Sequence, residues 1–280
     1  MDIDGLYARA RVLRAVRAYF DAQGFLEVET PVRIAAPAPE PHIDCPPSGS
    51  MFLRASPELQ MKKLVARGLG AIYQIGPCFR EGERGDRHRP EFTMLEWYRP
   101  GCGYEEIARD AEALLRAVLP GLPERFPRVS VRQAYRDWCG WDPFERWDGD
   151  RFDLDMALKV EPSLPRGPVF LWGYPAQAAS LSRLDPRDPS VAERWELYLD
   201  GIELANAFSE LVDPAEQERR FAAARAERRA LGEADYPLDR EFLDMLRALP
   251  PTGGAAMGID RLAMAAFGAS SIDAVSAPEG

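Results

Sequence analysis

Apolar positions near the start of the chain predict a helix followed by a strand. From Val12 to Phe20 they recur at helical spacing, and Gly24 ends the pattern of residues 8–23. Residues 25–30 then alternate between apolar and polar, and the alternation stops at Pro31 because proline cannot continue a ladder inside a sheet. An ordinary helix and edge strand explain this stretch without any functional role.

Residues 92–99 show the alternation with the clearest functional content. An extended chain places Phe92, Met94, Glu96 and Tyr98 on one face. That face combines a carboxylate, a phenol and an aromatic ring, which together suit the wall of a pocket for a cationic ligand. For Glu96 alone, a role as an ordinary ion-pair partner explains the residue equally well.

The segment before this strand is basic. Gly82 and Gly85 make it pliable, and its cationic side chains suit a polyphosphate. These side chains are Arg80, Arg84, Arg87, His88 and Arg89. Each of them taken singly fits a solvated loop. A basic loop beside an acidic strand favours two ligands instead, one anionic and one cationic.

Shorter elements precede this loop. Ser56, Pro57 and Glu58 open a helix that ends near Gly68, with the serine as cap and the carboxylate in the first turn. Both helix capping and ligand binding explain Glu58. Residues 71–75 have the composition of a short buried strand, whereas residues 35–50 are rich in proline, alanine and serine and predict a mobile loop.

Residues 195–210 predict a hairpin that turns at Asp200 and Gly201. The expected cross-strand pairs are Leu199 with Ile202, Tyr198 with Glu203, and Glu196 with Ala205. Glu196 and Glu203 therefore share a face, where two uncompensated carboxylates would repel each other. A divalent cation such as magnesium would remove that conflict, and a solvent-facing pair is the alternative.

Strict alternation sends Asn206 and Glu210 to the opposite face of this hairpin. They join the glutamates only if the second strand bulges or ends between Leu204 and Ala207.

Residues 252–268 predict a glycine-rich segment with a short strand of small residues, followed by a helix. Gly253, Gly254 and Gly258 allow the backbone to pass close to a flat or phosphorylated ligand, and Arg261 lies in the first turn of a helix that starts near Ile259. Glycine-rich turns between a strand and a helix also arise for packing reasons. Neither a Walker loop nor GxGxxG occurs in the chain.

Composition narrows the class of protein. The chain has 280 residues and a net charge of -10, which argues against a surface built for nucleic acid. Its four cysteines form no CxxC pair and only two histidines occur, so neither a zinc site nor a disulfide framework is indicated. The acidic N-terminus and the lack of a long apolar run predict a cytoplasmic protein that does not bind a membrane.

In this order, the motifs resemble the three signature motifs of class II aminoacyl-tRNA synthetases, in particular the lysyl subgroup. They are the helix and strand ending in EVETP, the stretch FRxxxxxxxHxPEFTMLEWY, and GxDRL at residues 258–262. The similarity continues through SPELQMKKL and GIELANAFSEL. The resemblance implies an α+β fold with an antiparallel sheet flanked by helices. It also implies a homodimer formed around the first motif.

The resemblance also implies roles in ATP binding. Arg80 would hold the α-phosphate, His88 would approach the outer phosphates, Phe92 would stack on adenine, and Arg261 would lie over the other adenine face or the γ-phosphate. Arg80 and Arg261 are thus the expected catalytic residues. The further ATP-binding positions are Glu81, Gly82, Glu83, Arg89, Glu203, Leu204 and Gly258. Glu196 and Glu203 would bind Mg²⁺.

A lysine-like substrate is implied by the remaining matches. Glu58 and Glu96 would lie near its α-amine, while Tyr98, Asn206 and Glu210 would receive its cationic side chain. The other expected pocket residues are Ser56, Pro57 and Ala256.

Three departures from the family pattern concern the same ligands, and one of them is Ala207, which replaces the glycine after Asn206. A further difference, at Ala256, is from the tRNA-charging enzymes. The family has asparagine and glutamate after the second-motif arginine, where this chain has Glu81 and Gly82, so either Glu81 or Glu83 could meet the adenine amine. Arg89 stands where asparagine is usual. Ala256 replaces a glycine, and its methyl group would reshape the amino-acid pocket.

The helix of the first motif starts almost at the first residue, so we expect a single catalytic domain over residues 1–280 with no anticodon-binding domain and no tRNA partner. Together with EWYRPG after the second motif, this resembles the elongation factor P lysine ligases, a stand-alone branch of the family. The implied activity is activation of lysine or β-lysine with ATP and transfer to a lysine of elongation factor P. A paralogue that acylates tRNA or a small molecule, and a non-catalytic amino-acid sensor, are the alternatives.

The sequence does not distinguish α-lysine from β-lysine, because one methylene shift lies within the tolerance of an acidic pocket. We expect the acceptor to be acidic like this chain, so its docking requires a local basic surface. Lys62, Lys63, Arg67 and the arginines of the basic loop are the candidates for that surface.

Overall fold

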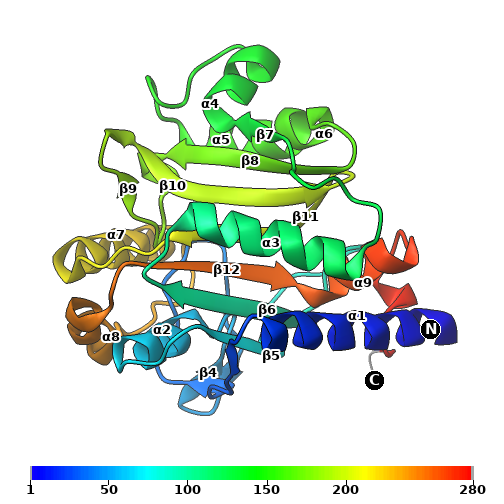
Figure 1. The fold of residues 1–280 in the computed structure, drawn as a ribbon. Coiled ribbons are helices and arrows are strands. Elements are labelled where there is room, and N and C mark those ends of the chain that lie inside the picture. The colour runs from blue at the N-terminus through cyan, green and yellow to red at the C-terminus, as the bar shows by residue number, and fades with distance from the viewer. Residues whose placement is uncertain (1, 279–280) are drawn as a thin grey trace. The chain divides into compact units, whose positions relative to one another are not determined.

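The computed structural model describes residues 2–278 (Figure 1). The chain divides into two compact units. Unit 1 contains the residues up to Gly101, Val212–Thr252 and the residues from Ala256 onward, and unit 2 contains Cys102–Leu211 with Gly253–Ala255. The prediction of one catalytic domain over the whole chain stays a prediction.

Unit 1 combines a sheet with helices at both ends of the sequence. Its strand order is β1-β5-β6-β12, with β1 parallel to β5 and β5 antiparallel to β6, and a small separate sheet has the order β2-β4-β3. The strands are β1 (Leu26–Glu27), β2 (Arg33–Ile34), β3 (Pro47–Ser48), β4 (Met51–Leu53), β5 (Ile72–Phe79), β6 (Glu91–Pro100) and β12 (Thr252–Gly258). The helices are α1 (Ile3–Ala22), α2 (Glu58–Ala66), α7 (Pro214–Leu231), α8 (Arg240–Met245) and α9 (Ile259–Phe267), with 3₁₀ turns η4 (Leu246–Ala248) and η5 (Ile272–Ala274).

The first predicted helix is confirmed and begins earlier than expected. Asp2 caps α1 by accepting a hydrogen bond from the amide of Asp4 at 2.9 Å. The predicted apolar face is buried, and the ring of Phe20 stacks on Tyr73 of β5 at 4.6 Å. The strand predicted for residues 25–30 is shorter, because only Leu26–Glu27 pairs in the ladder and the amide of Thr30 bonds to the side chain of Gln74.

The centre of unit 2 is a set of antiparallel strands. The strand order is β12-β11-β10-β8-β7, with β9 paired to β10 and β7 parallel to β8. The strands are β7 (Arg128–Ser130), β8 (Pro168–Pro175), β9 (Leu184–Asp185), β10 (Asp188–Leu199) and β11 (Ile202–Ser209). The helices are α3 (Tyr104–Val118), α4 (Val131–Ala134), α5 (Gly149–Asp155) and α6 (Glu161–Ser163), with π turns η1 (Tyr135–Cys139) and η2 (Met156–Val160) and the 3₁₀ turn η3 (Ala176–Ala178).

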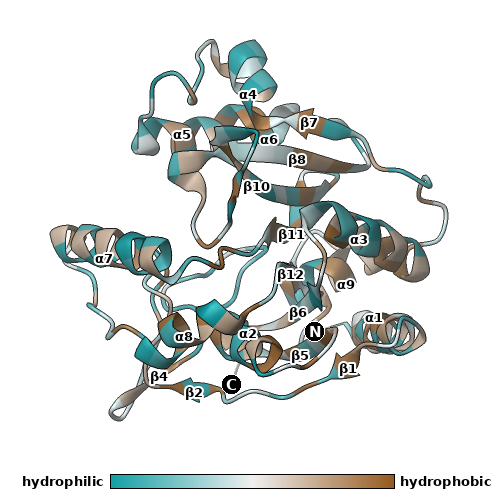
Figure 2. Ribbon diagram, turned by 60° about the vertical axis from the view of Figure 1, so that its left-hand side comes forward, coloured by the Kyte–Doolittle hydropathy of each residue, from teal (hydrophilic) through white to brown (hydrophobic). Residues whose placement is uncertain are grey.

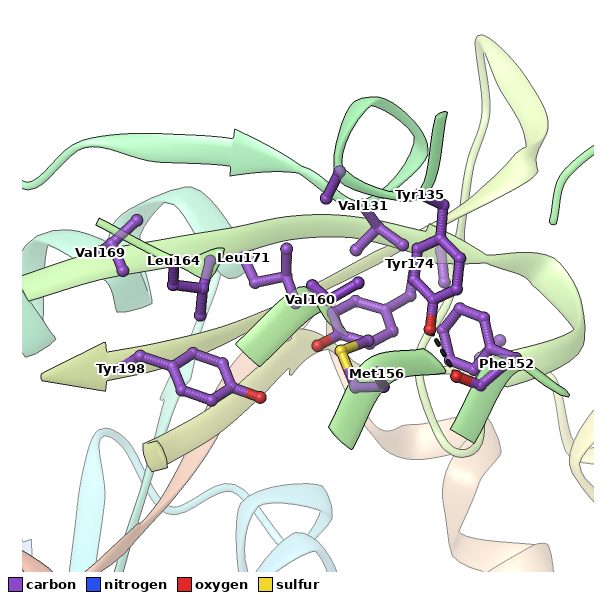
Figure 3. Close-up of a cluster of buried hydrophobic side chains, with 13 residues drawn as sticks. Val131, Tyr135, Phe152, Met156, Val160, Leu164, Val169, Leu171, Tyr174 and Tyr198 are labelled. Atoms are coloured by element: carbon purple, nitrogen blue, oxygen red, sulfur yellow. Dashed lines mark hydrogen bonds between the residues drawn. The ribbon is translucent and has the colours of Figure 1, made fainter. Parts of the chain in front are cut away.

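A cluster of buried aliphatic and aromatic side chains lies beside β8 in the core of unit 2 (Figure 3). Tyr135 stacks on Phe152 at 4.7 Å, and its hydroxyl donates to the backbone oxygen of Phe152 at 2.6 Å. Helix α3 carries hydrophilic and hydrophobic stretches side by side (Figure 2), as expected for an amphipathic helix packed on a sheet.

The α+β prediction is confirmed, since the large sheet is mainly antiparallel and flanked by helices. Within residues 2–278, no helix is both long and apolar enough to span a membrane.

Candidate active site

The carboxylate of Glu96 is the centre of the candidate amino-acid pocket in unit 1. Glu96 lies on β6 and is 1% exposed. It accepts hydrogen bonds from the hydroxyl of Ser56 at 2.5 Å and from the hydroxyl of Tyr98 at 3.0 Å. The predicted common face of Glu96 and Tyr98 is therefore confirmed. Burial, together with the nearby charge of Glu58, raises the pKa of Glu96 to about 7.

Glu58 lies next to this carboxylate and has a cation of its own. It is the first residue of α2, one position later than the predicted helix start, and its amide bonds to Ser56 at 3.0 Å. Its carboxylate forms an ion pair with Lys62, whose side chain is 2% exposed. The prediction that Lys62 belongs to a docking surface is wrong, because the side chain is buried in this pair. Lys63 and Arg67 are also matched by acidic partners, as both contact Glu241.

Arg80 and Phe92 form the core of the candidate ATP site in unit 1. The Cζ atom of Arg80 lies 5.2 Å from the centre of the Phe92 ring, and one terminal nitrogen lies 3.4 Å from Glu83. Among the described residues, the buried Nε atom of Arg80 has no hydrogen-bond partner. An arginine held by a ring and retaining an unused donor is suited to a phosphate oxygen.

The rest of the basic loop contacts other parts of unit 1. Arg261 of α9 contacts His88 through a terminal nitrogen, so the two expected phosphate ligands lie together. Gly82 has a φ of 80°, a conformation that favours glycine in this turn. Arg89 donates to the backbone oxygen of Ala277 at 2.7 Å and to Asp273 at 2.5 Å. Its expected role in ATP binding stays a prediction.

Sequence reasoning missed a junction that joins the three motifs. Asp260 of α9 accepts from the amide of Thr93 on β6 at 2.7 Å and from Arg9 on α1 at 2.5 Å. Arg9 also donates to the hydroxyl of Thr93 at 2.7 Å. The sequence signal that could have revealed this junction was Asp260, an acidic residue next to Arg261 in a helix predicted to pack against its neighbours. This junction fixes β6 next to the adenine-stacking candidate Phe92, the second residue of that strand.

Only part of the glycine-rich strand β12 leaves room for a ligand. A Cβ atom at Gly253 would approach the side chain of Ile107 to 2.5 Å, so glycine there is required by packing. A Cβ atom at Gly258 would touch only the side chain of Arg261, at 3.8 Å. Close ligand approach is therefore supported at Gly258, while at Gly253 the packing explanation holds. Ala256, on the same strand, is half-buried.

In unit 2, the predicted hairpin of residues 195–210 is confirmed. Asp200 and Gly201 both have positive φ angles, 51° and 78°, as a tight hairpin turn requires. Leu199 pairs with Ile202 and Tyr198 with Glu203, as predicted. The predicted pairing of Glu196 with Ala205 is wrong.

A bulge at Leu204 explains the difference. The register shifts between Leu197 and Tyr198, so that Ala205 lies opposite Leu197 and Asn206 lies opposite Glu196. The bulge brings Asn206 onto the face that carries Glu196 and Glu203, which is the condition stated above for a shared site.

Glu196 is held in a polar environment below the surface. It accepts from the hydroxyl of Tyr198 at 2.8 Å and pairs with Arg194 at 2.7 Å, and Arg194 also donates to Asn206 at 3.1 Å. Burial raises the pKa of Glu196, the charge of Arg194 lowers it, and the charge of Glu203 raises it further. The buried carboxylate of Glu196 and the half-buried carboxylate of Glu203 share one face of a strand pair. Such a pair suits an oxygen-preferring cation such as Mg²⁺, which keeps waters and phosphate oxygens as further ligands. Glu210, which follows β11, is buried and its backbone pairs with Ser182.

The model for tRNA synthetases class II (D, K and N) matches residues 4–277. The chain belongs to this family. Among curated members, the elongation factor P–(R)-β-lysine ligase of Vibrio cholerae is 37% identical over 310 residues, which cover 98% of this chain and 95% of that protein. The proteins of the same name from Histophilus somni and Proteus mirabilis are also 37% identical, over 98% of this chain and 94% of theirs. The resemblance stated from the motifs is confirmed.

Proposed function

We propose that this class II synthetase is an ATP-dependent ligase that joins lysine or β-lysine to a lysine side chain of elongation factor P. The observation that carries the proposal is on β6 of unit 1. The strand carries Phe92, under the guanidinium of Arg80, and Glu96, a buried carboxylate that accepts hydrogen bonds from the hydroxyls of Ser56 and Tyr98. Relatives that bear the ligase name over 98% of the chain support the same conclusion.

The first step is formation of an aminoacyl adenylate. A carboxylate oxygen of the amino acid attacks the α-phosphorus of ATP, and pyrophosphate leaves with the bonding electron pair. Arg80 stabilises the negative charge on the α-phosphate, and Arg261 and His88 bind the outer phosphates. Glu96 binds an ammonium group of the substrate and thereby orients its carboxylate.

We assign Mg²⁺ to Glu196 and Glu203 of unit 2, with Asn206 on the same face. When bound, the ion supplies positive charge that offsets the phosphate oxygens of ATP. The support is the raised pKa of Glu196 and the register that places both carboxylates on one face.

The second step transfers the acyl group. The acceptor lysine amine, after loss of a proton, attacks the acyl carbonyl, the carbon–oxygen bond to AMP breaks, and an amide remains. Neither step needs a covalent bond to the protein. Positioning and electrostatics therefore account for the rate.

We also propose a homodimer formed through the first motif, in the cytoplasm, without tRNA as partner. Ile3 and Tyr7 of α1 are 64% and 63% exposed, and Leu26 of β1, the edge strand of the unit 1 sheet, is 53% exposed. The net charge of -10 supports a protein rather than a nucleic acid as acceptor. No disulfide joins the cysteines of the described residues, which fits a reducing compartment. Light scattering should give the mass of two chains, and Tyr7→Glu should reduce it to one.

The deciding experiment is amino-acid-dependent exchange of pyrophosphate into ATP, followed by transfer. Exchange should occur with lysine or a β-lysine, and radiolabel should then appear on elongation factor P. Arg80→Ala should reduce exchange by about 100-fold or more. Label on tRNA with none on elongation factor P would overturn the proposal.

A further inference from the structure

Arg228 is the most extensively bonded side chain outside the residues discussed so far. It lies near the end of α7, far from every motif in sequence, and its side chain is 0% exposed. Its Nε atom donates to the backbone oxygen of Ala234 at 2.9 Å, and its guanidinium lies 4.4 Å from the centre of the Tyr236 ring. A fully buried arginine is costly unless its donors are satisfied.

The other guanidinium nitrogens bind a segment without regular structure, residues 40–45, which we call the anchor loop. One nitrogen donates to the backbone oxygens of Glu40 at 2.8 Å and Ile43 at 3.0 Å, and the other pairs with the carboxylate of Asp44. The hydroxyl of Tyr236 accepts from the amide of Cys45 at 2.8 Å. The planar fork of one arginine therefore holds several points of a loop that has no ladder of its own.

The anchor loop in turn holds the basic loop next to Arg80. The backbone oxygen of Asp44 accepts from the amide of Glu81 at 2.8 Å, and the amide of Arg80 bonds to Pro90 at 2.9 Å. The charges of Arg80 and Arg228 both lower the pKa of Cys45, against the larger effect of burial, which raises it to about 11. Asp44 thus connects the guanidinium of Arg228 to the amide of Glu81, which follows the expected α-phosphate ligand Arg80 in sequence.

We propose that Arg228 is a positioning residue for Arg80, acting through the anchor loop on the amide of Glu81. With Arg228 in place, the backbone at Arg80 and Glu81 keeps one position, so Arg80 presents its guanidinium to the α-phosphate without reorganisation. The inference rests on the proposed ATP chemistry, and it names a residue that no motif contains.

The main test compares Arg228→Lys with Arg225→Lys. The first keeps the charge and loses the planar fork of the guanidinium. The second alters an arginine on the same helix that pairs with Asp235, a residue outside the anchor loop. Calorimetry should show ATP affinity weakened about 10-fold in Arg228→Lys and unchanged in Arg225→Lys. In pyrophosphate exchange, the KM for ATP should rise and the KM for lysine should stay within about twofold.

A double-mutant cycle separates positioning from general loosening. In an Arg80→Ala background, Arg228→Lys should cause little further loss of ATP affinity, because the residue through which it acts is gone. Amide hydrogen exchange at residues 79–83 should be faster in Arg228→Lys. If that variant does not fold, Tyr236→Phe, which removes only the hydroxyl bound to Cys45, should show the same pattern more weakly.

Three results would overturn the inference: wild-type ATP affinity in Arg228→Lys, equal losses for ATP and lysine, or additive losses in the Arg80→Ala background. Failure of the proposed function has a different signature. The wild-type chain would then bind ATP and respond to Arg228→Lys, yet exchange no pyrophosphate with any lysine isomer.

Discussion

Glu96 in unit 1 and Glu196 in unit 2 occupy matching local settings with different charges around them. Each is a buried carboxylate on a strand, and each accepts from a tyrosine two residues later, Tyr98 at 3.0 Å and Tyr198 at 2.8 Å. The further hydrogen-bond partner of Glu96 is the neutral hydroxyl of Ser56. For Glu196 it is the guanidinium of Arg194 at 2.7 Å.

The acidic residues next to these two carboxylates differ in whether they have a cation of their own. Glu58, beside Glu96, has Lys62 as its ion-pair partner, whereas Glu203 shares the face of Glu196. In unit 1, Lys62 thus compensates the charge of Glu58, and the charge of Glu96 remains available to a ligand. Similar strand motifs can therefore be adapted to an ammonium group or to a metal ion by the position of one cation.

Glu96→Gln should have the largest effect on this comparison. It removes the charge that we propose binds the substrate ammonium and keeps the shape, so kcat/KM for lysine should fall about 1,000-fold while ATP affinity changes little. Pyrophosphate exchange and calorimetry with ATP measure the two quantities. Equal loss of ATP and lysine binding would remove the distinction between the two carboxylates.

Glu196→Gln should have the next largest effect, on the metal. The Mg²⁺ concentration for half-maximal exchange should rise about 10-fold or more, and the KM for lysine at saturating Mg²⁺ should stay within about twofold. Titration of Mg²⁺ in the exchange assay measures this. Arg187→Ala, at an exposed pair with Asp185 in the same unit, is a control that should leave both values unchanged.

The pH dependence of lysine binding should report Glu96. Its pKa is about 7, and only the ionised form attracts an ammonium group. Affinity should therefore be level above pH 7 and fall about tenfold per pH unit below it, with a proton released on binding near neutral pH. Calorimetry in buffers of different ionisation enthalpy measures that proton. A flat profile between pH 6 and 8, or the same profile in Glu96→Gln, would contradict the assignment.

The pH dependence of stability should also report Glu96. Because the pKa of Glu96 rises from 4.5 to about 7 on folding, the folded state binds the proton more tightly than the unfolded state. The free energy of unfolding should therefore fall as pH rises from about 4.5 to 7, by as much as about 3 kcal/mol. Glu96→Gln lacks this loss, so its melting temperature should exceed that of the wild type more at pH 8 than at pH 5.

The elements that carry short-range signals were predicted well. The first helix, the hairpin turn at Asp200 and Gly201, and the shared face of Glu96 and Tyr98 follow from periodicity and turn chemistry. The pairing of Glu196 was wrong because one bulged residue, Leu204, changes every later partner in the ladder. The sequence showed only that a bulge was needed for Asn206 to join the glutamates.

Family membership and the chemistry of the candidate residues could be inferred from the chain alone, because alternation, caps, turns and motif spacing act over a few residues. The burial and the ion-pair partners of individual charged side chains could not be inferred in this way. Lys62 was expected on a docking surface and is buried against Glu58, and Arg228 was not singled out although it holds a loop 184 residues away in sequence at Asp44. Burial and ion pairing depend on which distant segments pack together, so only the tertiary structure decides which charges are compensated inside the protein and which remain available to a ligand.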